Sequence, residues 1–256
     1  MQNDSLGDRM KTYENAFRFY VPIHSYLIVR VDGKAFHTFT RHCDRPFDSH
    51  LIAAMDATAL ALCQEMQNSC FAYTQSDEIS ILLYDFTRIG TSAWFDNNML
   101  KICSVSAALA TSNFIRHFFD PDHMEGPIDE VIPQGLAFDG RLFILPTKDE
   151  VANYYVWRQQ DCTRNSVQMA ARAMFSHKEC YQKNNAQLQE MLFQKGYNWD
   201  DCIPRCKRGG FVDYETSPNP TEENRPCWKY RDPPIFTQDR PFLLKRIPDP
   251  LQDEPK

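Results

Sequence analysis

The amino-acid sequence predicts an α+β fold in which an antiparallel sheet packs against helices on one face. Three observations support this prediction. With 43% hydrophobic and 24% charged residues, the 256-residue chain can bury a substantial core in one principal domain with an appendage. Strand-like apolar runs alternate with stretches of helical spacing. The elements follow one another in the order β-α-β-β-α-β, which is the split βαβ arrangement of the ferredoxin-like fold.

The first strand and the first helix are predicted from two neighbouring segments. Residues 25–33 ("SYLIVRVDG") form a continuous apolar and β-branched run that an Asp-Gly dipeptide stops, which is typical of a strand buried on both faces. Residues 48–67 place their apolar side chains at helical spacing, with Asp48 or Ser49 as the N-cap. A strand followed by a helix therefore opens the fold.

The next elements are two strands, a helix and a fourth strand. Residues 70–75 and 78–86 are predicted as strands because apolar and other residues alternate along the second run. Residues 94–119 show helical spacing, and residues 140–147 ("GRLFILPT") form a strand that a proline closes. These elements complete a predicted domain over residues 1–147.

The pattern changes after this domain. Residues 148–213 begin with a long helical stretch and end in a basic segment, so we expect a helical and basic extension. From Pro218 onward the chain contains nine of its sixteen prolines. Residues 214–256 are therefore expected to form an extended proline-rich tail without regular structure, which wraps the body or a partner.

Charge and composition exclude several classes of protein. The formal net charge of −6 excludes a generally basic nucleic-acid-binding protein, so any phosphate-bearing partner must bind a local basic patch. No apolar stretch approaches the ~20 residues of a membrane span and the start lacks a signal-peptide pattern, so we expect a cytoplasmic protein without membrane contact. Cys202 and Cys206 lack the second ligand pair of a zinc finger, so we expect a plain loop there.

The predicted topology brings carboxylates together. Asp32 ends the first strand, whereas Asp77 and Glu78 lie at the turn between the second and third strands, at the same edge of the sheet. Clustered carboxylates repel one another unless a cation lies between them, and Mg²⁺ prefers such hard oxygen ligands. Two Mg²⁺ ions ~4 Å apart hold the attacking and leaving oxygens in phosphoryl transfer. Taken alone, Asp32-Gly33 and Asp77-Glu78 are each more typical of a turn. Their expected position at one edge of the sheet indicates nucleotidyl transfer on a palm-like sheet.

Four motifs also carry a resemblance to a known family. They are "RVDGKAFHTFTR" (30–41), "YTQSDEISILL" (73–83), "FDGRLFILPT" (138–147) and "YVWRQQDC" (155–162). In this order and at these intervals, they resemble the histidine-tRNA guanylyltransferase family, including its bacterial and archaeal guanylyltransferase-like branch. The similarity covers residues 1–213, and four ordered motifs are much more specific than any one of them.

The resemblance implies a fold related to the polymerase palm and a reaction that adds nucleotides to the 5′ end of tRNA, in the 3′→5′ direction. It implies two Mg²⁺ ions held by Asp32, Asp77 and the carbonyl of Gly33, with Glu78 in support. ATP activates the 5′-monophosphate of the tRNA, or a triphosphate end is already present, and the 3′-hydroxyl of GTP then attacks it. The resemblance also implies a homotetramer with tRNA spanning the subunits.

The resemblance further assigns residues that contact nucleotides and tRNA. Beside the metal-binding carboxylates, the nucleotide and its triphosphate would contact Gly33, Lys34, Ala35, Phe36, His37 and Ser76. The basic side chains that would stabilise charge on the transferred phosphorus are Lys34, Arg45, Lys101 and Arg141. Contacts to tRNA or its 5′ end are expected from Arg141, Arg158, Arg164, Asn165, Lys207 and Arg208. The rings of Phe36 and Phe39 are expected in the core rather than against a base.

One departure from the family pattern bears on the reaction. Eukaryotic members that add a single guanosine to histidine tRNA carry His-Ile-Asn-Asn after the last motif, where this chain has Thr163, Arg164, Asn165 and Ser166. The departure favours the guanylyltransferase-like branch, which repairs 5′-truncated tRNA by copying the opposite strand. A strict non-templated guanylyltransferase stays an alternative. A nucleotide cyclase is a second alternative, which the basic "CKRGG" segment disfavours. A non-catalytic tRNA-binding module is a third, which the intact carboxylates disfavour.

Overall fold

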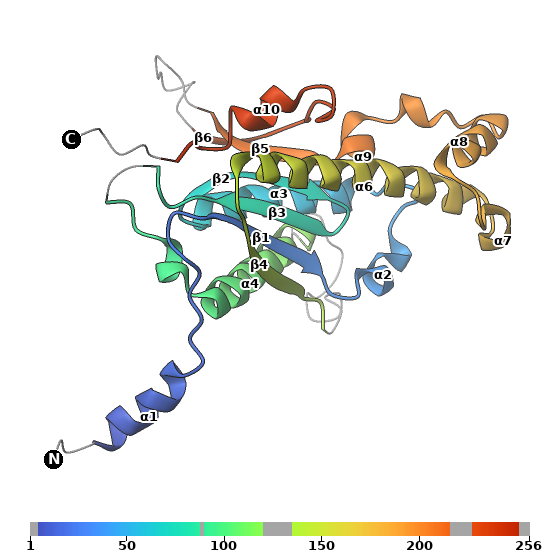
Figure 1. Cartoon of the computed structure of the whole chain (residues 1–256). Coiled ribbons are helices and arrows are strands. Elements are labelled where there is room, and N and C mark those ends of the chain that lie inside the picture. Colours follow the sequence, from blue (N-terminus) through green and yellow to red (C-terminus); the bar gives the residue numbers. More distant parts are fainter. Residues whose placement is uncertain (1–4, 88–89, 120–134, 216–226, 251–256) are drawn as a thin grey trace.

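The computed structural model describes residues 5–87, 90–119, 135–215 and 227–250. Within them the six predicted elements follow in the predicted order (Figure 1). They are β1 (Tyr26–Gly33), α3 (Ser49–Glu65), β2 (Ser69–Gln75), β3 (Glu78–Leu83), α4 (Met99–Phe118) and β4 (Phe138–Leu145). Shorter elements between them are α2 (Phe36–Phe39) and the 3₁₀ helices η1 (Thr40–His42) and η2 (Trp94–Asn97). The predicted α+β class is confirmed.

The strands form one antiparallel sheet in the order β4-β1-β3-β2-β5-β6. Its last two strands are β5 (Gly210–Glu215) and β6 (Cys227–Arg231), which the sequence did not predict. The register pairs Asp32 at the end of β1 with Glu78 on one side and with Asp139 of β4 on the other. Three acidic residues therefore lie side by side across neighbouring strands.

Helices cover both faces of the sheet, whereas the sequence predicts helices on one face. On one face, α3 and α4 pack on a core that includes Val29 of β1. On the other face, α6 (Lys148–Met174) and α10 (Arg240–Leu244) cover a second core that includes Ile28 and Tyr155 (Figure 1). Neighbouring residues of β1 thus point into different cores, which confirms the prediction of a strand buried on both faces.

The predicted helix over residues 94–119 is divided at Asn98. Phe95 and Asp96 have positive φ angles of 50° and 53°, which end the regular helical path of η2 before α4 begins. The Asn98 side chain then caps α4 by accepting a hydrogen bond from the Lys101 N–H at 3.0 Å. The cap leaves Lys101 exposed in the first turn of α4, with its Nζ 4.7 Å from the centre of the Phe95 ring.

The proline-rich tail contains regular structure, so its prediction as an extended segment is wrong for β6 and α10. The β6 strand gains backbone hydrogen bonds by pairing with β5. Phe236 and Leu243 are fully buried in the second core, which stabilises this part of the tail against the body. Pro241 lies in the first turn of α10, where the missing N–H costs no helical hydrogen bond. The rest of the tail lies outside the described residues.

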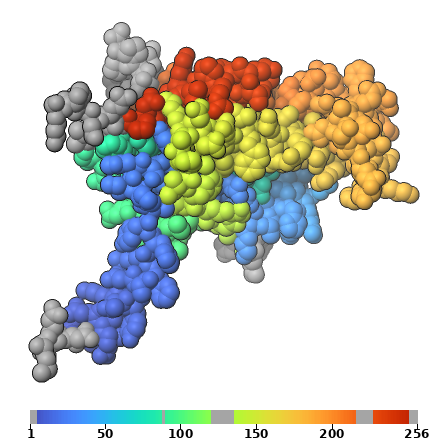
Figure 2. Space-filling view, in the orientation of Figure 1, coloured from blue at the N-terminus to red at the C-terminus, as the bar shows by residue number. Residues whose placement is uncertain are grey.

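The helical extension continues α6 beyond the sheet. Its further helices are α7 (His177–Cys180), α8 (Asn185–Gln194), the 3₁₀ helix η4 (Trp199–Asp201) and α9 (Pro204–Arg208). Val167 and Leu188 belong to a third, smaller core between α6 and α8. This end of the molecule projects from the body in Figure 2. Cys206 lies in α9, where the sequence predicts a loop.

An N-terminal helix, α1 (Leu6–Asn15), was not predicted and stands away from the body (Figure 1). None of its residues is buried. Ser5 caps it by accepting a hydrogen bond from the Asp8 N–H at 3.1 Å. Within the described residues, no helix combines the length and apolar character that crossing a membrane requires.

Candidate active site

The end of β1 and the β2–β3 turn meet at one edge of the sheet. Gln75 and Glu78 pair across β2 and β3, so Ser76 and Asp77 form the turn between the strands. Ser76 has a positive φ of 47°, which allows the chain to reverse tightly. The Gly33 N–H donates a hydrogen bond to the Asp77 carbonyl oxygen at 3.0 Å. This bond fixes the turn beside the end of β1, so the predicted proximity of the two segments is present.

Both aspartates have raised pKa values. Burial, and after it the negative charge of Asp32, raises the pKa of Asp77 to about 6. Burial, and after it the charge of Asp139, raises the pKa of Asp32. Each carboxylate is thus held where its charged form is disfavoured, which is the condition that a bound cation relieves. Within the described residues, no three His, Cys, Asp or Glu side chains are grouped to hold a metal by themselves.

Asp139 is a third carboxylate at this edge, and the sequence analysis missed its position beside Asp32. The signal was available, because Asp139 precedes Gly140 in β4 as Asp32 precedes Gly33 in β1. Its carboxylate is exposed and lies 3.3 Å from the Nε of Arg141. Arg141 is therefore engaged by an acidic neighbour at the rim of the site.

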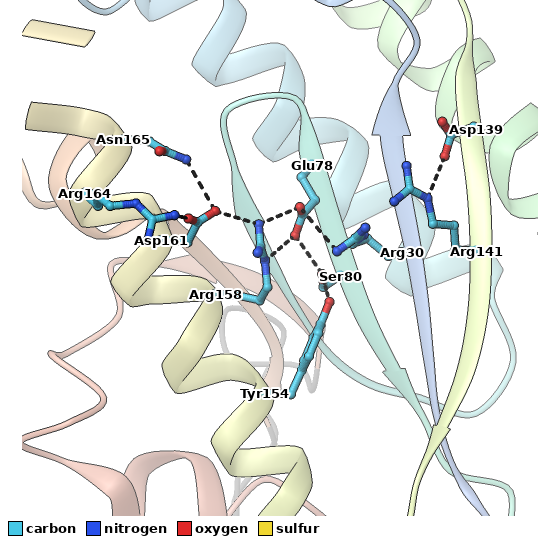
Figure 3. A network of polar contacts seen from close by, with 10 residues as sticks. All are labelled: Arg30, Glu78, Ser80, Asp139, Arg141, Tyr154, Arg158, Asp161, Arg164 and Asn165. Carbon is cyan, nitrogen blue, oxygen red and sulfur yellow. Dashed lines mark hydrogen bonds and ion pairs between the residues drawn. The ribbon is translucent and has the colours of Figure 1, made fainter. Parts of the chain in front are cut away.

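Glu78 differs from its neighbour Asp77 because its carboxylate points toward α6 (Figure 3). The Nε and Nη2 atoms of Arg158 donate to its two oxygens at 2.8 and 2.7 Å. The Nη1 of Arg30 lies 3.9 Å from Oε2, and the Ser80 hydroxyl donates to Oε1 at 3.2 Å. Both oxygens of Glu78 are thus occupied by cationic and hydroxyl donors. This geometry places Glu78 in a supporting role at the turn.

Arg158 is buried, which disfavours the predicted contact of this residue with tRNA or its 5′ end. Its residue exposure is 7%, and its guanidinium is bound by Glu78 and, at 3.1 Å, by Asp161. Two carboxylates neutralise the guanidinium, so little of it is left for an external phosphate. Asp161 also binds the guanidinium of Arg164 and, at 3.3 Å, the amide of Asn165. Arg164 and Asn165 stay exposed, as a tRNA contact requires.

The residues after Asp32 form a tight turn into α2. A Cβ added to Gly33 would lie 2.3 Å from the ring of Phe36, so only glycine fits here. That ring is buried against Phe39, as the sequence predicts. The N–H groups of Gly33 and Lys34 already donate to backbone carbonyls, the second at 2.8 Å to Ala137. The exposed atoms of this turn come from Lys34, Ala35 and His37.

The remaining basic candidates are dispersed over the surface. Arg45 and Lys101 are exposed, on the segment before α3 and on α4. The Lys207 ammonium contacts the Asp200 carbonyl and lies 5.5 Å from the ring of Trp199. Arg208 is half-buried, and its Nε has no partner. The structure therefore does not gather these side chains into one cluster.

A cavity of about 420 Å³ is lined by the two aspartates and by residues of α3, α6 and α9. The predicted site residues that line it are Asp32, Ser76, Asp77, Glu78, Arg158 and Asn165. Those that do not are Gly33, Lys34, Ala35, Phe36, His37, Arg45, Lys101, Arg141, Arg164, Lys207 and Arg208. Arg205 of α9 is buried and donates through Nε to Asp56 of α3 at 2.9 Å, which joins two of the walls.

Arg172 lines the cavity as well, and the sequence analysis missed it. It follows Arg158 and Asn165 on α6 at helical spacing, so all three lie on one face of the helix. This periodicity was available in the sequence.

The chain is similar to proteins of one family. A model described as "Thg1: tRNAHis guanylyltransferase" matches residues 7–146. A bacterial tRNA(His) guanylyltransferase (Thg1)-like protein has been solved in complex with ATP and with GTP. It is 39% identical to this chain, with TM-scores of 0.83 and 0.79, over 95% of this chain and 99% of its own.

Curated relatives are more distant. An uncharacterized protein, R259, of Acanthamoeba polyphaga mimivirus is 29% identical over 82% of this chain and 77% of its own length. The tRNA(His) guanylyltransferase of Schizosaccharomyces pombe is 31% identical over 64% of this chain, and the match spans 58% of that enzyme. Because the family model covers more than half of the 256 residues, the chain belongs to the tRNAHis guanylyltransferase family of nucleotidyltransferases.

Proposed function

We propose that this nucleotidyltransferase extends the 5′ end of tRNA in the 3′→5′ direction by copying the opposite strand. Its task would be the repair of 5′-truncated tRNA, including the addition of guanosine to histidine tRNA. The observation that carries the proposal is the pair Asp32 and Asp77, two half-buried carboxylates with raised pKa values on the wall of one cavity. The similarity to a protein solved with ATP and with GTP supports nucleoside triphosphates as substrates.

The proposed metal site consists of Asp32, Asp77 and the carbonyl of Gly33. The donor set fits two Mg²⁺ ions, because all donors are hard oxygens and because the charge of Asp32 adds to burial in raising the pKa of Asp77, a shift that a bound cation would relieve. Bound Mg²⁺ would stabilise the charge that develops on the transferred phosphorus. The protein holds the two carboxylates in place through the Gly33–Asp77 backbone bond and keeps Glu78 away from them with Arg158.

In the proposed reaction, ATP activates the 5′-monophosphate of the tRNA or a triphosphate end is already present. The 3′-hydroxyl of GTP forms the new phosphodiester bond, and AMP or pyrophosphate leaves. Exposed residues beside the aspartates would contact the incoming nucleotide: Lys34, Ala35, His37 and Ser76. Lys34, Arg45, Lys101 and Arg141 are proposed to bind phosphates at the rim.

The segment that departs from the family pattern supports templated copying. The Thr163 hydroxyl donates to the Lys207 carbonyl at 2.9 Å, and the Ser166 hydroxyl accepts from the Trp199 indole at 2.9 Å. Arg164 and Asn165 both bind Asp161. All four side chains are engaged within the protein, so none is arranged to select a non-pairing 5′ nucleotide. Base pairing would then supply sequence selection, and the protein would read phosphates and shape.

We further propose that the protein is a homotetramer, that it is cytoplasmic and that its sheet is related to the polymerase palm.

The arm formed by α1 supports self-association. Leu6, Met10 and Tyr13 follow one another at helical spacing on α1, and Phe17 lies just beyond its end; their exposed fractions are 66%, 44%, 64% and 68%. A short helix that buries nothing is marginal alone, so a second subunit is the natural partner for its apolar face. Phe17→Asp should reduce the molecular mass in light scattering while leaving the circular dichroism spectrum unchanged.

The function is tested with purified protein, Mg²⁺, ATP, labelled GTP and two histidine tRNAs, one complete and one lacking its first 5′ nucleotide. Sizing of the products should show extension of the truncated tRNA alone. Addition opposite a non-pairing base of the complete tRNA would support the strict guanylyltransferase instead. If neither tRNA is extended, assays for cyclic nucleotide formation and for tRNA binding separate the cyclase from the non-catalytic binding module. Asp77→Asn serves as the inactive control.

A further inference from the structure

A second cavity is lined by residues of α6, α7 and α8. Figure 1 shows α7 and α8 at the end of α6 that extends beyond the sheet. The cavity has a volume of about 200 Å³ and is enclosed by α6, α7, α8 and the segment between α7 and α8. Its lining residues are Gln168, Arg172, His177, Cys180, Tyr181, Gln182, Lys183 and Leu188. The lining contains no carboxylate. Arg172 and Lys183 give it two positive charges.

The two cations of this cavity have no partner among the described residues. Among the described residues, the side chains of Arg172 and Lys183 make no hydrogen bond or ion pair, whereas the Arg164 side chain on the same helix is bound by Asp161. The carboxylate of Glu179 on α7 is also engaged, because it accepts hydrogen bonds from the N–H and the hydroxyl of Ser176 at 2.8 and 2.6 Å. A concave surface with unpaired cations is suited to an anion.

The second cavity shares part of its lining with the candidate active site. Gln168 and Arg172 line both cavities, so one face of α6 forms a wall that runs from the aspartates to α7 and α8. Along the helix, Arg158 and Arg172 are separated by about 20 Å at 1.5 Å per residue. A ligand that occupies both ends must therefore be an extended polyanion.

We propose that the second cavity binds a backbone phosphate of the RNA strand whose 5′ end reacts at Asp32 and Asp77, a few nucleotides from that end. The inference rests on the proposed function and adds to it the place where the substrate strand is held. Arg172 would bind the phosphate with its guanidinium and Lys183 with its ammonium, while the Gln168 amide and the Tyr181 hydroxyl can donate further hydrogen bonds. Such a contact would retain RNA without reading its sequence.

The test compares the double variant Arg172→Ala/Lys183→Ala with the matched control Lys178→Ala. Lys178 is exposed on α7 and lines neither cavity, so it removes a nearby charge without changing the site. The affinity for a labelled tRNA transcript lacking its first 5′ nucleotide is measured by fluorescence anisotropy over a series of salt concentrations. The affinity of each protein for GTP is measured by calorimetry.

We expect the double variant to bind the transcript about 10-fold more weakly and to lose about 0.7 to 0.9 from the salt slope per phosphate contact removed. The melting temperature should stay at the wild-type value, and Lys178→Ala should keep the wild-type salt slope and GTP affinity. Arg172→Lys/Lys183→Arg, which keeps both charges, should recover most of the affinity.

Three outcomes overturn the proposal. Unchanged RNA affinity and slope in the double variant would show that no RNA phosphate lies in the cavity. A loss of GTP affinity with unchanged RNA affinity would assign the cavity to the triphosphate of a free nucleotide. In both cases extension of truncated tRNA by the wild-type protein leaves the proposed function standing. If the wild-type protein neither binds nor extends the transcript, the proposed function fails together with the inference.

Discussion

Asp77 and Glu78 are neighbours in the chain but lie in opposite electrostatic surroundings. Asp77 faces the cavity beside Asp32, without a cation, and its pKa is raised to about 6. Glu78 points to α6, where Arg158 binds both of its oxygens. Both carboxylates are largely withdrawn from water, yet only one of them is neutralised by the protein itself.

Because of this difference, the two carboxylates of one turn have different roles. The Glu78–Arg158 pair connects β3 to α6 and so fixes the turn from one side. Asp77 is left with uncompensated charge, which costs stability until a cation is bound. Proteins accept such a local cost where the residue serves a reaction. The comparison therefore predicts that changes at Asp77 damage activity and spare the fold, whereas changes at Arg158 do the reverse.

The largest effect is expected from Asp77→Asn. The substitution keeps the shape of the side chain and removes a metal-binding charge, so nucleotide addition should fall by at least 10,000-fold, a barrier increase of about 5.5 kcal/mol. The circular dichroism spectrum and the melting temperature should not fall. The check is a single-turnover assay on truncated tRNA. A stably folded variant with wild-type activity would refute the assignment of Asp77 to the metal site.

A smaller effect, on stability, is expected from Arg158→Met. It leaves the buried Glu78 carboxylate with only the more distant Arg30 as a counter-charge, so unfolding in urea should require about 3 kcal/mol less. The double variant Glu78→Gln/Arg158→Met removes both charges and should recover most of this loss. Because Glu78 is not placed as a metal ligand, the double variant should also add nucleotides at a rate within about 10-fold of wild type. Complete inactivity of a stable double variant would restore Glu78 to the catalytic group.

The pH dependence of stability measures the cost at Asp77 directly. Its carboxyl titrates at 3.8 when unfolded and at about 6 in the fold, so the native state binds more protons between these values. The free energy of unfolding should therefore fall as pH rises through this window, by about 2 kcal/mol. With chelator present, raising the pH from 4 to 7 should lower the free energy of unfolding of the wild-type protein by about 2 kcal/mol more than that of Asp77→Asn. Parallel urea stability curves for the two proteins would contradict the raised pKa.

The sequence predicts the aspartate site well because short-range rules determine it. The Asp-Gly stop after a buried strand, the two-residue turn and the β-α-β-β-α-β order are sufficient to bring Asp32 and Asp77 to one edge. The four motifs identified the family, and the family model confirmed it. Asp139 precedes Gly140 as Asp32 precedes Gly33, but this repeat alone does not place the two aspartates together, because only the register of β4 against β1 makes them neighbours.

The partners of Glu78 could not be predicted because they depend on tertiary packing. Nothing local indicates that α6 crosses the face of the sheet opposite α3, and only that crossing brings Arg158 to β3. A charged residue in a helix is usually exposed, so the sequence favoured a surface role for Arg158. The tail was predicted incorrectly for the same reason. Its proline content favours irregular structure, whereas the burial of Phe236 in the second core depends on tertiary packing.

The smallest effect is expected from Tyr154→Phe, which tests how far the division between the two sides of the turn extends. The Tyr154 hydroxyl and the Ser80 hydroxyl share a hydrogen bond of 2.8 Å, and Ser80 in turn donates to Glu78. Phenylalanine keeps the ring packed against Phe143 and removes only the hydroxyl, so stability should fall by about 1 kcal/mol. Nucleotide addition should change less than 2-fold. Urea unfolding and the single-turnover assay measure the two quantities on one preparation.

A loss of stability near 3 kcal/mol would mean that the hydroxyls and the Glu78–Arg158 pair act as one cooperative network. A large loss of activity at unchanged stability would show instead that the Glu78 side of the turn takes part in the reaction, and the contrast with Asp77 would not hold.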